Sequence, residues 1–350
     1  MKEKTVVLGL SGGVDSACTA VFLREQGYTV IGAFLSNSGS DDSAARRTAQ
    51  QLGIDFVCID MTQKLESQVI EPFVRGYACG MTPIPCVLCN PAVKFRLLFD
   101  LADRLGAQYV ATGHYARTGR TAGGVPSLYR SPASNDQAYM LYRLPCTWIE
   151  RLLLPLGEEK SKADIRAYAH RVGVDVFDKP DSMEICFIPD NDYAAFIESR
   201  GVCPLPGDFV DEQGRVLGRH KGIHHYTVGQ RRGLGIAAEG RLYVTRIDPQ
   251  SNRVVLALTD PYKAQITLGE LCMTAPEYGA LSAFEADVMV RHGKKTYPAR
   301  VVRTGETTAH VDFHEPARAP SPGQSAVFFG PDGRVLGGGI IQREAQEDEQ

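Results

Sequence analysis

Cysteines are the residues of this chain whose spacing most directly indicates chemistry. Cys86 and Cys89 form a C-x-x-C in TPIPCVLCNPAVKF, and Cys186 lies much further along, in DSMEICFIPD. In an intracellular protein a C-x-x-C is typical of half a metal site, a redox pair, or a nucleophile with a neighbour. A reactive cysteine requires a partly exposed, electropositive site that lowers the thiol pKa. The spacing alone leaves the three possibilities open.

A glycine-rich loop is the second candidate site. LSGGVDS, residues 10–16, lies between a β-rich run and a stretch with helical spacing. Its two glycines allow a tight turn close to a ligand, and the following helix directs its N–H groups and positive dipole end at the turn. Ser11 and Ser16 supply hydroxyl donors, and Asp15 is a candidate Mg²⁺ ligand. The loop is not a Walker A motif, because no Gly-Lys-Ser/Thr ends it.

The string SGGVDS after a first strand resembles the PP-loop of ATP pyrophosphatases. These enzymes split ATP between the α and β phosphates and adenylate a substrate oxygen, which ammonia, an amine or sulfur then displaces. The resemblance implies ATP binding by the loop and by neighbouring strand ends, through Gly9, Leu10, Ser11, Gly12, Gly13, Val14, Asp15, Ser16, Leu35 and Gly113.

Alternating strands and helices must position these residues. The apolar spacing predicts strands at Thr5–Leu10, Thr29–Leu35, Phe56–Ile59 and Tyr109–Thr112, and helices at Ser16–Gln26, Asp42–Leu52 and Ala92–Leu105. This rhythm predicts an α/β domain with a parallel sheet and helices on both faces. Ligands of such sheets bind beyond the carboxyl ends of the strands. The SGGVDS loop, Leu35 and Gly113-His114 all fall there.

The pattern changes after about Pro189, where Pro and Gly recur among short β-type runs. These runs predict a small linking module and then an antiparallel barrel from about Thr267. The predicted strands are Arg241–Ile247, Arg253–Ala257, Ala286–Val290, Ala299–Val302, Ala309–Phe313 and Ser325–Phe329. We therefore expect a PP-loop catalytic domain at 1–195, a central module at 196–265, a barrel at 266–343 and a disordered acidic tail at 344–350.

The composition favours a cytosolic protein. No run approaches the ~20 apolar residues of a membrane span, and Val6–Leu10 is too short for a secretory signal. Nine cysteines, an odd number, do not fit a secreted disulfide framework. Cys18, Cys58 and Cys272 have apolar surroundings and are expected in the core.

A net charge of −3 means that any RNA-binding surface must be local. The span Gly214–Ala238 contains no Asp or Glu and is rich in basic side chains, namely Arg215, Arg219, Lys221, Arg231 and Arg232 with His220, His224 and His225. Such a local excess of cations suits a phosphate backbone. A solvated loop face is the alternative interpretation on composition alone.

Taken together, the motifs resemble the bacterial tRNA-uridine 2-sulfurtransferases, the MnmA/TrmU family of 2-thiouridylases. The matching strings, in order, are SGGVDS, PCVLCN with KF after it, ATGHYA, NDQAYML, EICFIPD, PGDFVD, HKGIHHYTVGQRRGLG and PGQSAVFF. They extend over nearly the whole chain. The resemblance implies a monomeric, cytosolic enzyme that uses ATP and Mg²⁺ to convert the wobble uridine of tRNA to 2-thiouridine. A cysteine desulfurase or a sulfur relay protein would supply the sulfur.

The resemblance also assigns roles to two cysteines. Cys186 corresponds to the cysteine that carries a persulfide, and Cys89 to the nucleophile. ATP converts uracil O2, a poor leaving group, to an AMP ester, and the terminal sulfur on Cys186 attacks C2. Cys89 then takes the other sulfur, leaving a Cys89–Cys186 disulfide, or instead releases hydrosulfide that attacks. A thiol reductant must reset the pair.

Contacts with tRNA are implied at residues that match the family's RNA-facing stretches. They are His114, Asn135, Asp136, Gln137, Arg231, Arg232, Arg291, His292 and Gln324. Lys294 and Lys295 add a basic edge to the predicted barrel. Asn135 stands where the family usually has Lys, which implies one weaker phosphate contact.

The chain departs from the family before the nucleophile. Ile84 and Cys86 in TPIPC replace the usual Asn and Asp of T-P-N-P-D. Cys86 is therefore an inert or supporting neighbour, a resolving thiol, or a ligand of a [4Fe–4S] cluster with Cys89 and Cys186. A zinc site is less expected, since a fourth ligand at suitable spacing is missing. Two rival functions stay open: a PP-loop amide or amine ligase, and a non-catalytic tRNA-binding protein.

Overall fold

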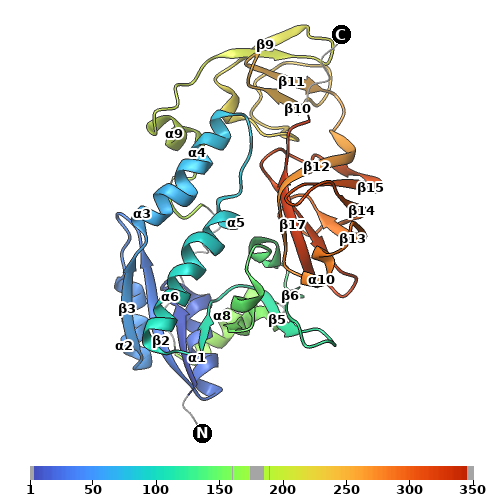
Figure 1. Ribbon diagram of the computed structural model, residues 1–350. Coiled ribbons are helices and arrows are strands. Elements are labelled where there is room, and N and C mark those ends of the chain that lie inside the picture. The colour runs from blue at the N-terminus through green and yellow to red at the C-terminus, as the bar shows by residue number, and fades with distance from the viewer. Residues whose placement is uncertain (1–3, 160, 174–184, 189, 345–350) are drawn as a thin grey trace. The chain divides into compact units, whose positions relative to one another are not determined.

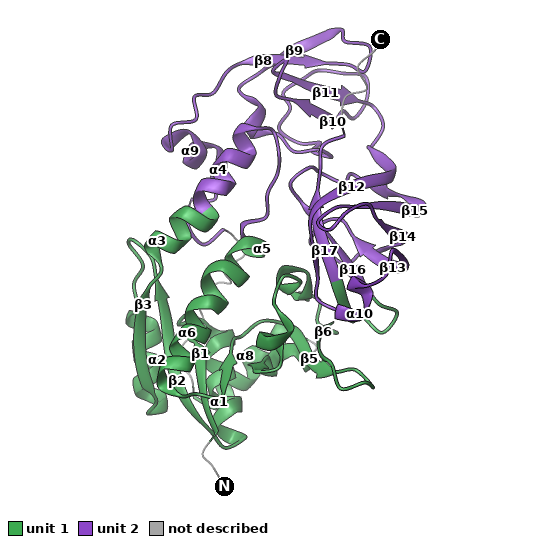
Figure 2. Ribbon diagram, in the orientation of Figure 1, with its two compact units in different colours: residues 1–69, 86–183, 330–336 green, residues 70–85, 184–329, 337–350 purple. Residues whose placement is uncertain are grey.

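The computed structural model describes residues 4–159, 161–173, 185–188 and 190–344. They form two compact units, each built from segments far apart in sequence (Figures 1 and 2). Unit 1 comprises residues 1–69, 86–183 and 330–336, and unit 2 comprises 70–85, 184–329 and 337–350. The predicted acidic tail lies outside the described residues apart from Glu344, as does part of DSMEICFIPD.

Unit 1 contains a five-stranded sheet in the order β3-β2-β1-β4-β7, and its strand pairs are all parallel. The strands are β1 Lys4–Gly9, β2 Tyr28–Ser36, β3 Asp55–Asp60, β4 Tyr109–Ala111 and β7 Leu152–Leu153. The helices that alternate with them are α1 Val14–Glu25, α2 Ser43–Leu52, α6 Phe95–Leu105 and α8 Lys162–Arg171. The predicted α/β fold with a parallel sheet is confirmed.

The sequence explains both the strands and their ends. Val6, Val7 and Leu8 in β1 are fully buried, as expected for a strand that is covered on both faces. Helices α2 and α6 end at Gly53 and Gly106, whose φ angles of 58° and 67° are left-handed. Glycine carries no Cβ penalty in that conformation, so it stops each helix cleanly.

The cysteine segment begins earlier than the predicted helix at Ala92–Leu105. Helix α5 spans Pro85–Cys89 and runs through a π-helical turn, Asn90–Lys94, into α6. Pro91 has no N–H for an ordinary helical bond. The π turn contains this proline, and such turns are frequent at functional sites.

Further short elements complete unit 1 and join it to unit 2. Helix α3, Thr62–Leu65, leads through a π turn at Glu66–Ile70 into α4, Glu71–Ala78. The remaining elements of unit 1 are β5 Ala116–Arg120, β6 Pro126–Arg130, α7 Cys146–Ile149 and the 3₁₀ turns Ala138–Leu141 and Pro155–Glu158.

Unit 2 holds a four-stranded sheet and a closed barrel. The sheet has the order β10-β11-β8-β9, with α9 at Tyr193–Ser199 and a 3₁₀ turn at Ile223–His225 beside it in the chain. Its strands are β8 Gly207–Val210, β9 Val216–His220, β10 Tyr243–Asp248 and β11 Arg253–Ala257. Phe209, Val244 and Leu256 are fully buried in its core.

The predicted antiparallel barrel is confirmed as six strands in the order β12-β15-β14-β13-β16-β17. They are β12 Tyr262–Met273, β13 Ala283–Met289, β14 Tyr297–Arg303, β15 Ala309–Arg318, β16 Ser325–Phe329 and β17 Val335–Ile341, with helix α10 at Pro276–Gly279. Strand β17 was not predicted, because the three glycines of VLGGGII interrupt its apolar pattern. One of them, Gly339, leaves room for the backbone of Gly269, because a Cβ there would lie 3.0 Å from its carbonyl oxygen.

The expectation for the isolated cysteines is partly wrong. Cys18 is buried, and burial raises the pKa of its thiol to about 12. Cys58 is exposed, because β3 is an edge strand, and Cys272 is partly buried. Among the helices that the structure describes, none is long and apolar enough to cross a membrane.

Candidate active site

The SGGVDS loop connects β1 to α1 at the carboxyl edge of the sheet. Gly12 has a φ of 76°, and a Cβ on it would lie 2.7 Å from the backbone nitrogen of Ala45. Gly13 is the N-cap of α1, and no side chain caps this helix. The first N–H groups of α1 are thereby left to the loop, which is the arrangement that binds phosphate at a helix N-terminus.

Two serine hydroxyls fix the shape of the loop. The Oγ atoms of Ser11 and Ser16 lie 3.2 Å apart, and the backbone N–H of Ser11 donates to Ser16 Oγ over 3.2 Å. The Ser16 hydroxyl in turn donates to the Gly13 carbonyl over 3.0 Å. The hydroxyls that the sequence predicts as ligand donors therefore also hold the loop in place before any ligand arrives.

Asp15 lies between two groups that the sequence analysis did not select. The Tyr115 hydroxyl donates to Asp15 Oδ1 over 2.7 Å, and Lys162 Nζ lies 3.4 Å from Oδ2. Tyr115 is 1% exposed, whereas the Asp15 and Lys162 side chains are 27% and 29% exposed. Lys162 is the first residue of α8, after the N-cap Ser161. The loop thus has a partly exposed cation beside a carboxylate that Tyr115 holds by a hydrogen bond.

The predicted meeting of strand ends is confirmed for β1 and β4. Strand β1 lies between β2 and β4 in the sheet, so the residues after all three strands share one edge. A Cβ on Gly113 would lie 3.0 Å from the Asp15 carbonyl carbon, which means that the two loops touch. Leu35, near the end of β2, is partly buried on the other side of β1.

His114 is held on the same edge. Its Nδ1 lies 2.8 Å from Thr112 Oγ1, and its ring stacks on Phe95 with centroids 5.8 Å apart. Burial, and then the charge of Lys94, hold the pKa of His114 well below its ordinary value. The imidazole is therefore neutral at pH 7 and can offer a hydrogen bond but no charge to RNA.

The donor set gives limited support to a metal in the loop. Asp15 is the one carboxylate of SGGVDS, and both of its oxygens already face protein donors. Mg²⁺ usually keeps several waters and binds through one or two carboxylates together with substrate phosphates. Asp15 fits a contact to such a phosphate-borne ion, not a separate all-protein metal site.

Cys86 and Cys89 lie one turn apart on α5, since residues at i and i+3 share a helix face. Cys86 is exposed and Cys89 is partly buried. The π turn follows directly, and within it the Asn90 side-chain amide donates to the Met140 carbonyl over 2.9 Å. Asn90, which directly follows Cys89, thus ties the cysteine helix to the NDQAYML segment.

Cys186 lies in unit 2, on an exposed turn. Its neighbours anchor that turn, because the Phe187 ring meets Phe73 edge-on at 5.6 Å and Ile188 is 3% exposed. Phe73 belongs to α4, the helix that precedes the cysteine segment in the chain. The sulfur is therefore presented outward on a base of packed aromatic side chains.

Gln324 holds the segment that leads to the cysteine helix. Its side-chain amide donates to the Thr82 carbonyl over 2.9 Å, and the Thr82 N–H donates to the Pro322 carbonyl over 2.8 Å. These bonds lie within unit 2 and fix the TPIPC segment to the loop before β16. A role in RNA contact remains a prediction for Gln324.

The predicted RNA-facing residues at 135–137 make internal bonds. Asp136 is 8% exposed and accepts from the Ser131 N–H at 2.9 Å and from Arg130 Nε at 3.1 Å. Gln137 Oε1 accepts from the Tyr115 N–H over 2.9 Å. Asp136 and Gln137 therefore shape the turn beside the SGGVDS loop, and Asn135 is partly exposed next to them.

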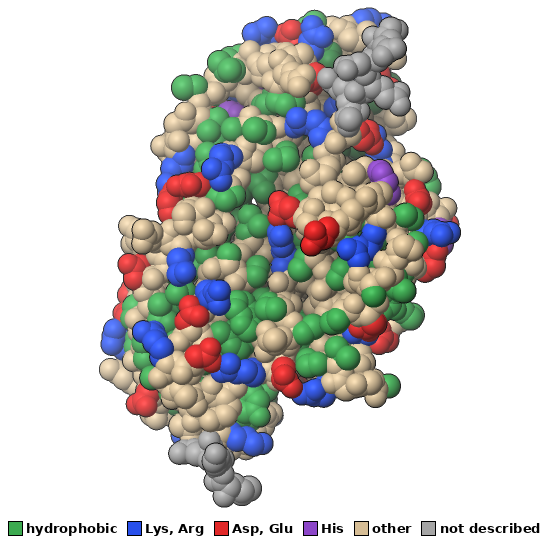
Figure 3. Space-filling model, viewed as in Figure 1, with side chains coloured by type: hydrophobic (Ala, Val, Ile, Leu, Met, Phe, Trp, Pro, Cys, Tyr) green, Lys and Arg blue, Asp and Glu red, His purple; other side chains and the backbone are tan. Residues whose placement is uncertain are grey.

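Acidic side chains outside the predicted basic segment, Gly214–Ala238, reduce its positive charge in the folded chain. Arg215 pairs with Asp211 at 2.6 Å and Arg219 with Asp208 at 2.9 Å, so neighbouring acids neutralise two of its cations. Arg231 and Arg232 are exposed, as is His292, while Arg291 donates to the Ala319 carbonyl. On the face that Figure 3 shows, acidic and basic side chains are interspersed.

One other cluster has metal-ligand chemistry. Glu198 Oε1 lies 3.1 Å from the Nε2 atoms of both His224 and His225, and this is the one such group of three that the described ranges contain. Burial, then His224, lowers the pKa of His225, and the bond from His224 lowers that of Glu198. The three side chains satisfy one another as hydrogen-bonded partners and tie α9 to the HKGIHHY segment.

Family models match three successive parts of the chain. They are described as a tRNA methyl transferase HUP domain at residues 4–190, a tRNA methyl transferase PRC-barrel domain at 195–258, and an aminomethyltransferase beta-barrel domain at 262–341. Together they cover nearly all the described residues.

Curated relatives match over nearly their full length. The tRNA-specific 2-thiouridylase MnmA of Clostridium acetobutylicum is 39% identical, with 97% of this chain and 100% of that protein covered. MnmA of Rhodospirillum rubrum is 42% identical, with 96% and 95% covered. The solved U34-tRNA thiolase NcsA of Methanococcus maripaludis has a TM-score of 0.34 at 16% identity, covering 56% of this chain and 66% of that one, which is too low to carry an argument.

Proposed function

This chain belongs to the MnmA family of tRNA-specific 2-thiouridylases, and on that basis we propose that it catalyses ATP-dependent 2-thiolation of the wobble uridine of tRNA. The observation that carries the proposal is the match to these relatives over nearly the whole chain and nearly their whole length. A PP-loop with a phosphate-binding geometry and two separate cysteines outside the core are consistent with it.

The first step is the activation of the uridine. The uracil O2 attacks the α phosphate of ATP, the bond to the β phosphate breaks, and pyrophosphate leaves. The backbone of the loop and the N-terminus of α1 bind the phosphates, and Lys162 neutralises charge that develops on pyrophosphate. Asp15, held by Tyr115, orients Lys162 and would contact Mg²⁺ bound with the nucleotide, which would supply further charge neutralisation at the phosphates.

The second step delivers sulfur. The terminal sulfur of a persulfide on Cys186 attacks C2, and AMP leaves with the former O2. The Cys89 thiolate then attacks Cys186 Sγ, which breaks the S–S bond and leaves the electron pair on the 2-thiouridine sulfur. Alternatively Cys89 releases hydrosulfide first. Both routes leave a Cys89–Cys186 disulfide, so an external thiol must reduce it before the next turnover.

Two roles of Cys86 are compared with this scheme. Cys86 is exposed on α5, one turn before Cys89. In the persulfide route it either assists Cys89 or takes no part in the reaction. As a third thiolate with Cys89 and Cys186, it would complete a [4Fe–4S] ligand set with one iron open. The similarity to MnmA proteins, which carries the proposal, gives no support to the cluster. We therefore propose the persulfide route.

We propose that exposed cations of unit 2 contact the RNA backbone and that His114 of unit 1 contacts a nucleotide. Arg231, Arg232 and His292 are exposed and suit phosphate contacts, and neutral His114 suits a hydrogen bond to a base or a 2′-hydroxyl. Asp136 and Gln137 act indirectly, by shaping the turn beside the loop. We further propose a cytosolic enzyme with sulfur supplied by a desulfurase or a relay protein, and a domain division at 1–195, 196–265 and 266–343.

One assay separates this function from its rivals. Unmodified tRNA transcript is incubated with the chain, ATP, Mg²⁺, a persulfide donor and a thiol reductant, and digested nucleosides are analysed by mass spectrometry. We expect 2-thiouridine at the wobble position and one pyrophosphate for each. A ligase would release pyrophosphate but give no 2-thiouridine and would keep its activity in Cys89→Ser. A non-catalytic binder would release no pyrophosphate.

A further inference from the structure

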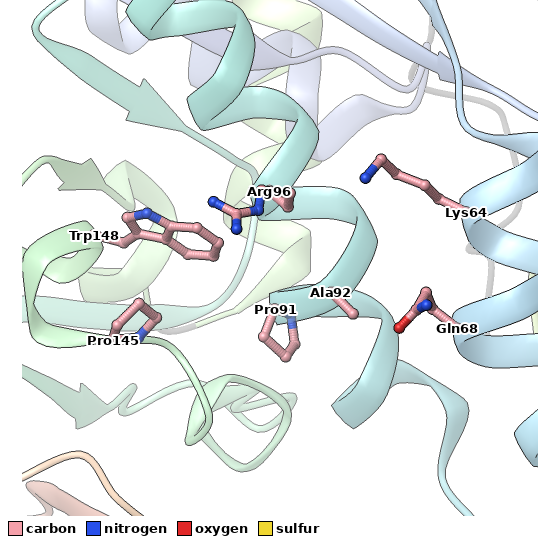
Figure 4. Close-up of a pocket in the computed structure, with 7 residues that line it drawn as sticks. All are labelled: Lys64, Gln68, Pro91, Ala92, Arg96, Pro145 and Trp148. Carbon is pink, nitrogen blue, oxygen red and sulfur yellow. The ribbon is translucent and has the colours of Figure 1, made fainter.

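A cavity of about 600 Å³ in unit 1 lies beside the cysteine helix and has no role in the scheme above (Figure 4). Three separate parts of the unit line it: α3 with the π turn after it, the helix that follows Cys89, and the start of α7. The lining residues are Lys64, Gln68, Pro91, Ala92, Arg96, Pro145 and Trp148.

The lining combines cations with flat apolar surfaces. Lys64 and Arg96 both reach the cavity, from α3 and α6, and none of the described residues that line it is acidic. Arg96 Nη1 lies 3.9 Å from the Asp100 carboxylate, and both side chains are about half exposed. That distance and exposure give a weak ion pair. The guanidinium is therefore available to an anion from solvent.

Trp148 packs against two side chains of α6 at the wall of the cavity. Its ring stacks on Phe99 with centroids 5.0 Å apart and an interplanar angle of 17°, and the Arg96 guanidinium lies 5.6 Å from its centroid. The indole is only partly buried. Figure 4 shows Trp148 above Pro145, with the Arg96 guanidinium beside the indole. A packed, partly exposed aromatic ring costs little entropy when a planar ligand packs on it.

Cations beside an aromatic platform are the arrangement that binds single-stranded nucleic acid. Each nucleotide offers a planar base for stacking and a phosphate for Lys or Arg. The cavity lies within the size range of small-molecule and nucleotide sites. An acidic peptide would use the cations but would leave the indole and proline surfaces without a partner. The lining therefore favours RNA.

The cavity lies close to Cys89, and this position indicates which nucleotide of the RNA it would bind. Pro91 and Ala92 follow Cys89 by two and three residues in one continuous helical segment. At about 1.5 Å of rise per residue this is within one helical turn. A nucleotide in the cavity would therefore lie close to the nucleotide that reaches Cys89.

We propose that this cavity binds the nucleotide next to the thiolated uridine in the anticodon loop. Its base packs on Trp148 and Pro145, and its phosphate lies between Lys64 and Arg96. The proposal rests on the proposed function, since it takes tRNA as the substrate. It adds a binding site that holds the loop open while the neighbouring uridine enters the catalytic centre.

Trp148 is the one tryptophan in the sequence, so it reports on its own site. A dye-labelled anticodon stem-loop is titrated into the intact chain, with anisotropy of the dye and fluorescence of Trp148 followed together. We expect the tryptophan emission to change with the same midpoint as the anisotropy. An emission that stays constant while anisotropy shows saturation would overturn the proposal.

Variants test the two cations. Lys64→Gln and Arg96→Gln are expected to weaken stem-loop binding about tenfold each and to lower the slope of log Kd against log salt by about 0.7. Arg104→Gln, an exposed arginine further along α6, is the matched control and should bind as wild type. Unchanged affinity and slope in both cavity variants, or an equal tryptophan response to polyglutamate, would overturn the proposal.

An assay of 2-thiouridine formation separates a failure of the cavity proposal from a failure of the proposed function. Wild type that forms 2-thiouridine but keeps constant tryptophan emission on RNA binding contradicts the cavity alone. Wild type that neither binds the stem-loop nor forms 2-thiouridine contradicts both.

Discussion

The hydroxyl of Tyr115 donates a 2.7 Å hydrogen bond to Asp15, a hundred residues earlier in the chain, and so fixes the carboxylate of the ATP loop. The tyrosine is fully buried, and Lys162 approaches the other oxygen of the same carboxylate. Tyr115 acts as a positioning residue, since it is too buried to touch the substrate itself. This relationship makes the loop a preformed site and gives the first two predictions.

Tyr115→Phe removes this hydrogen bond and keeps the ring. Hydrogen bonds to charged groups contribute about 1.5–3 kcal/mol, so we expect kcat/KM for ATP to fall about tenfold or more. Stem-loop binding should not change. Steady-state pyrophosphate release measures the first and anisotropy the second.

Tyr168→Phe is the matched control, because the Tyr168 hydroxyl also donates to a carboxylate, Glu25, over 2.9 Å but away from the loop. It should keep wild-type kcat/KM. Equal effects of the two substitutions would show that Tyr115 has only a general structural role.

Lys162→Gln removes the cation beside the loop. Removing a donor that stabilises developing charge typically costs about 10²- to 10³-fold in kcat, and we expect a fall in this range. Lys162→Arg keeps the charge and should recover a measurable part of the rate. A wild-type rate of pyrophosphate release in Lys162→Gln would refute the assignment.

Gly12→Ala should weaken ATP binding by distorting the SGGVDS loop. The left-handed backbone alone costs about 1–3 kcal/mol, and the added Cβ would press on the start of α2. We expect a rise of more than tenfold in KM for ATP. Gly27→Ala is the control, because Gly27 has a similar φ of 80° but no atom lies within 4 Å of an added Cβ. It introduces the backbone strain without the steric contact and should leave KM for ATP unchanged.

His114 should stay neutral at physiological pH. Burial and Lys94 lower its pKa when the chain is folded, so the native state favours the neutral ring. The stability that follows is present above the ordinary pKa of about 6.5 and is lost as pH falls through the lower, folded value. The melting temperature should therefore drop more steeply between pH 7 and pH 5 in wild type than in His114→Asn.

An NMR titration gives a direct check. A midpoint for His114 at or above 6.5 would contradict the predicted direction.

Cys86 is expected to be dispensable. Cys86→Ser and Cys86→Asp should retain activity within about threefold, whereas Cys89→Ser and Cys186→Ser should form no 2-thiouridine. Iron and acid-labile sulfide should be absent from anaerobically purified protein. Stoichiometric iron that is lost in Cys86→Ser together with activity would instead establish the cluster route.

The sequence predicted the parallel sheet, the barrel and the loop because each has a strong local signal. An apolar run marks β1, helical spacing that ends at Gly53 marks α2, and SGGVDS has few structural alternatives. It did not predict the π turn at Asn90–Lys94, because helical spacing does not distinguish one helical register from another. The glycine-rich strand β17 was missed for a related reason, since its stability comes from barrel pairing.

The site residues show the same division. Tyr115 and Lys162 were missed because their contacts with Asp15 arise from the packing of α8 and the segment after β4, not from spacing near the loop. The available signals were the Tyr of GHY and the Lys after a helix-capping serine. Asp136 was predicted as RNA-facing, but spacing cannot tell that its carboxylate is turned inward to Ser131 and Arg130.

A single-turnover experiment tests the central claim most directly. The chain is loaded with persulfide, mixed with ATP, Mg²⁺ and tRNA without reductant, quenched, and mapped by peptide mass spectrometry. We predict a persulfide on the Cys186 peptide at the start, and at the end one 2-thiouridine for each Cys89–Cys186 disulfide. Formation of 2-thiouridine with both cysteines still reduced, or at the wild-type rate in Cys186→Ser, would contradict the account.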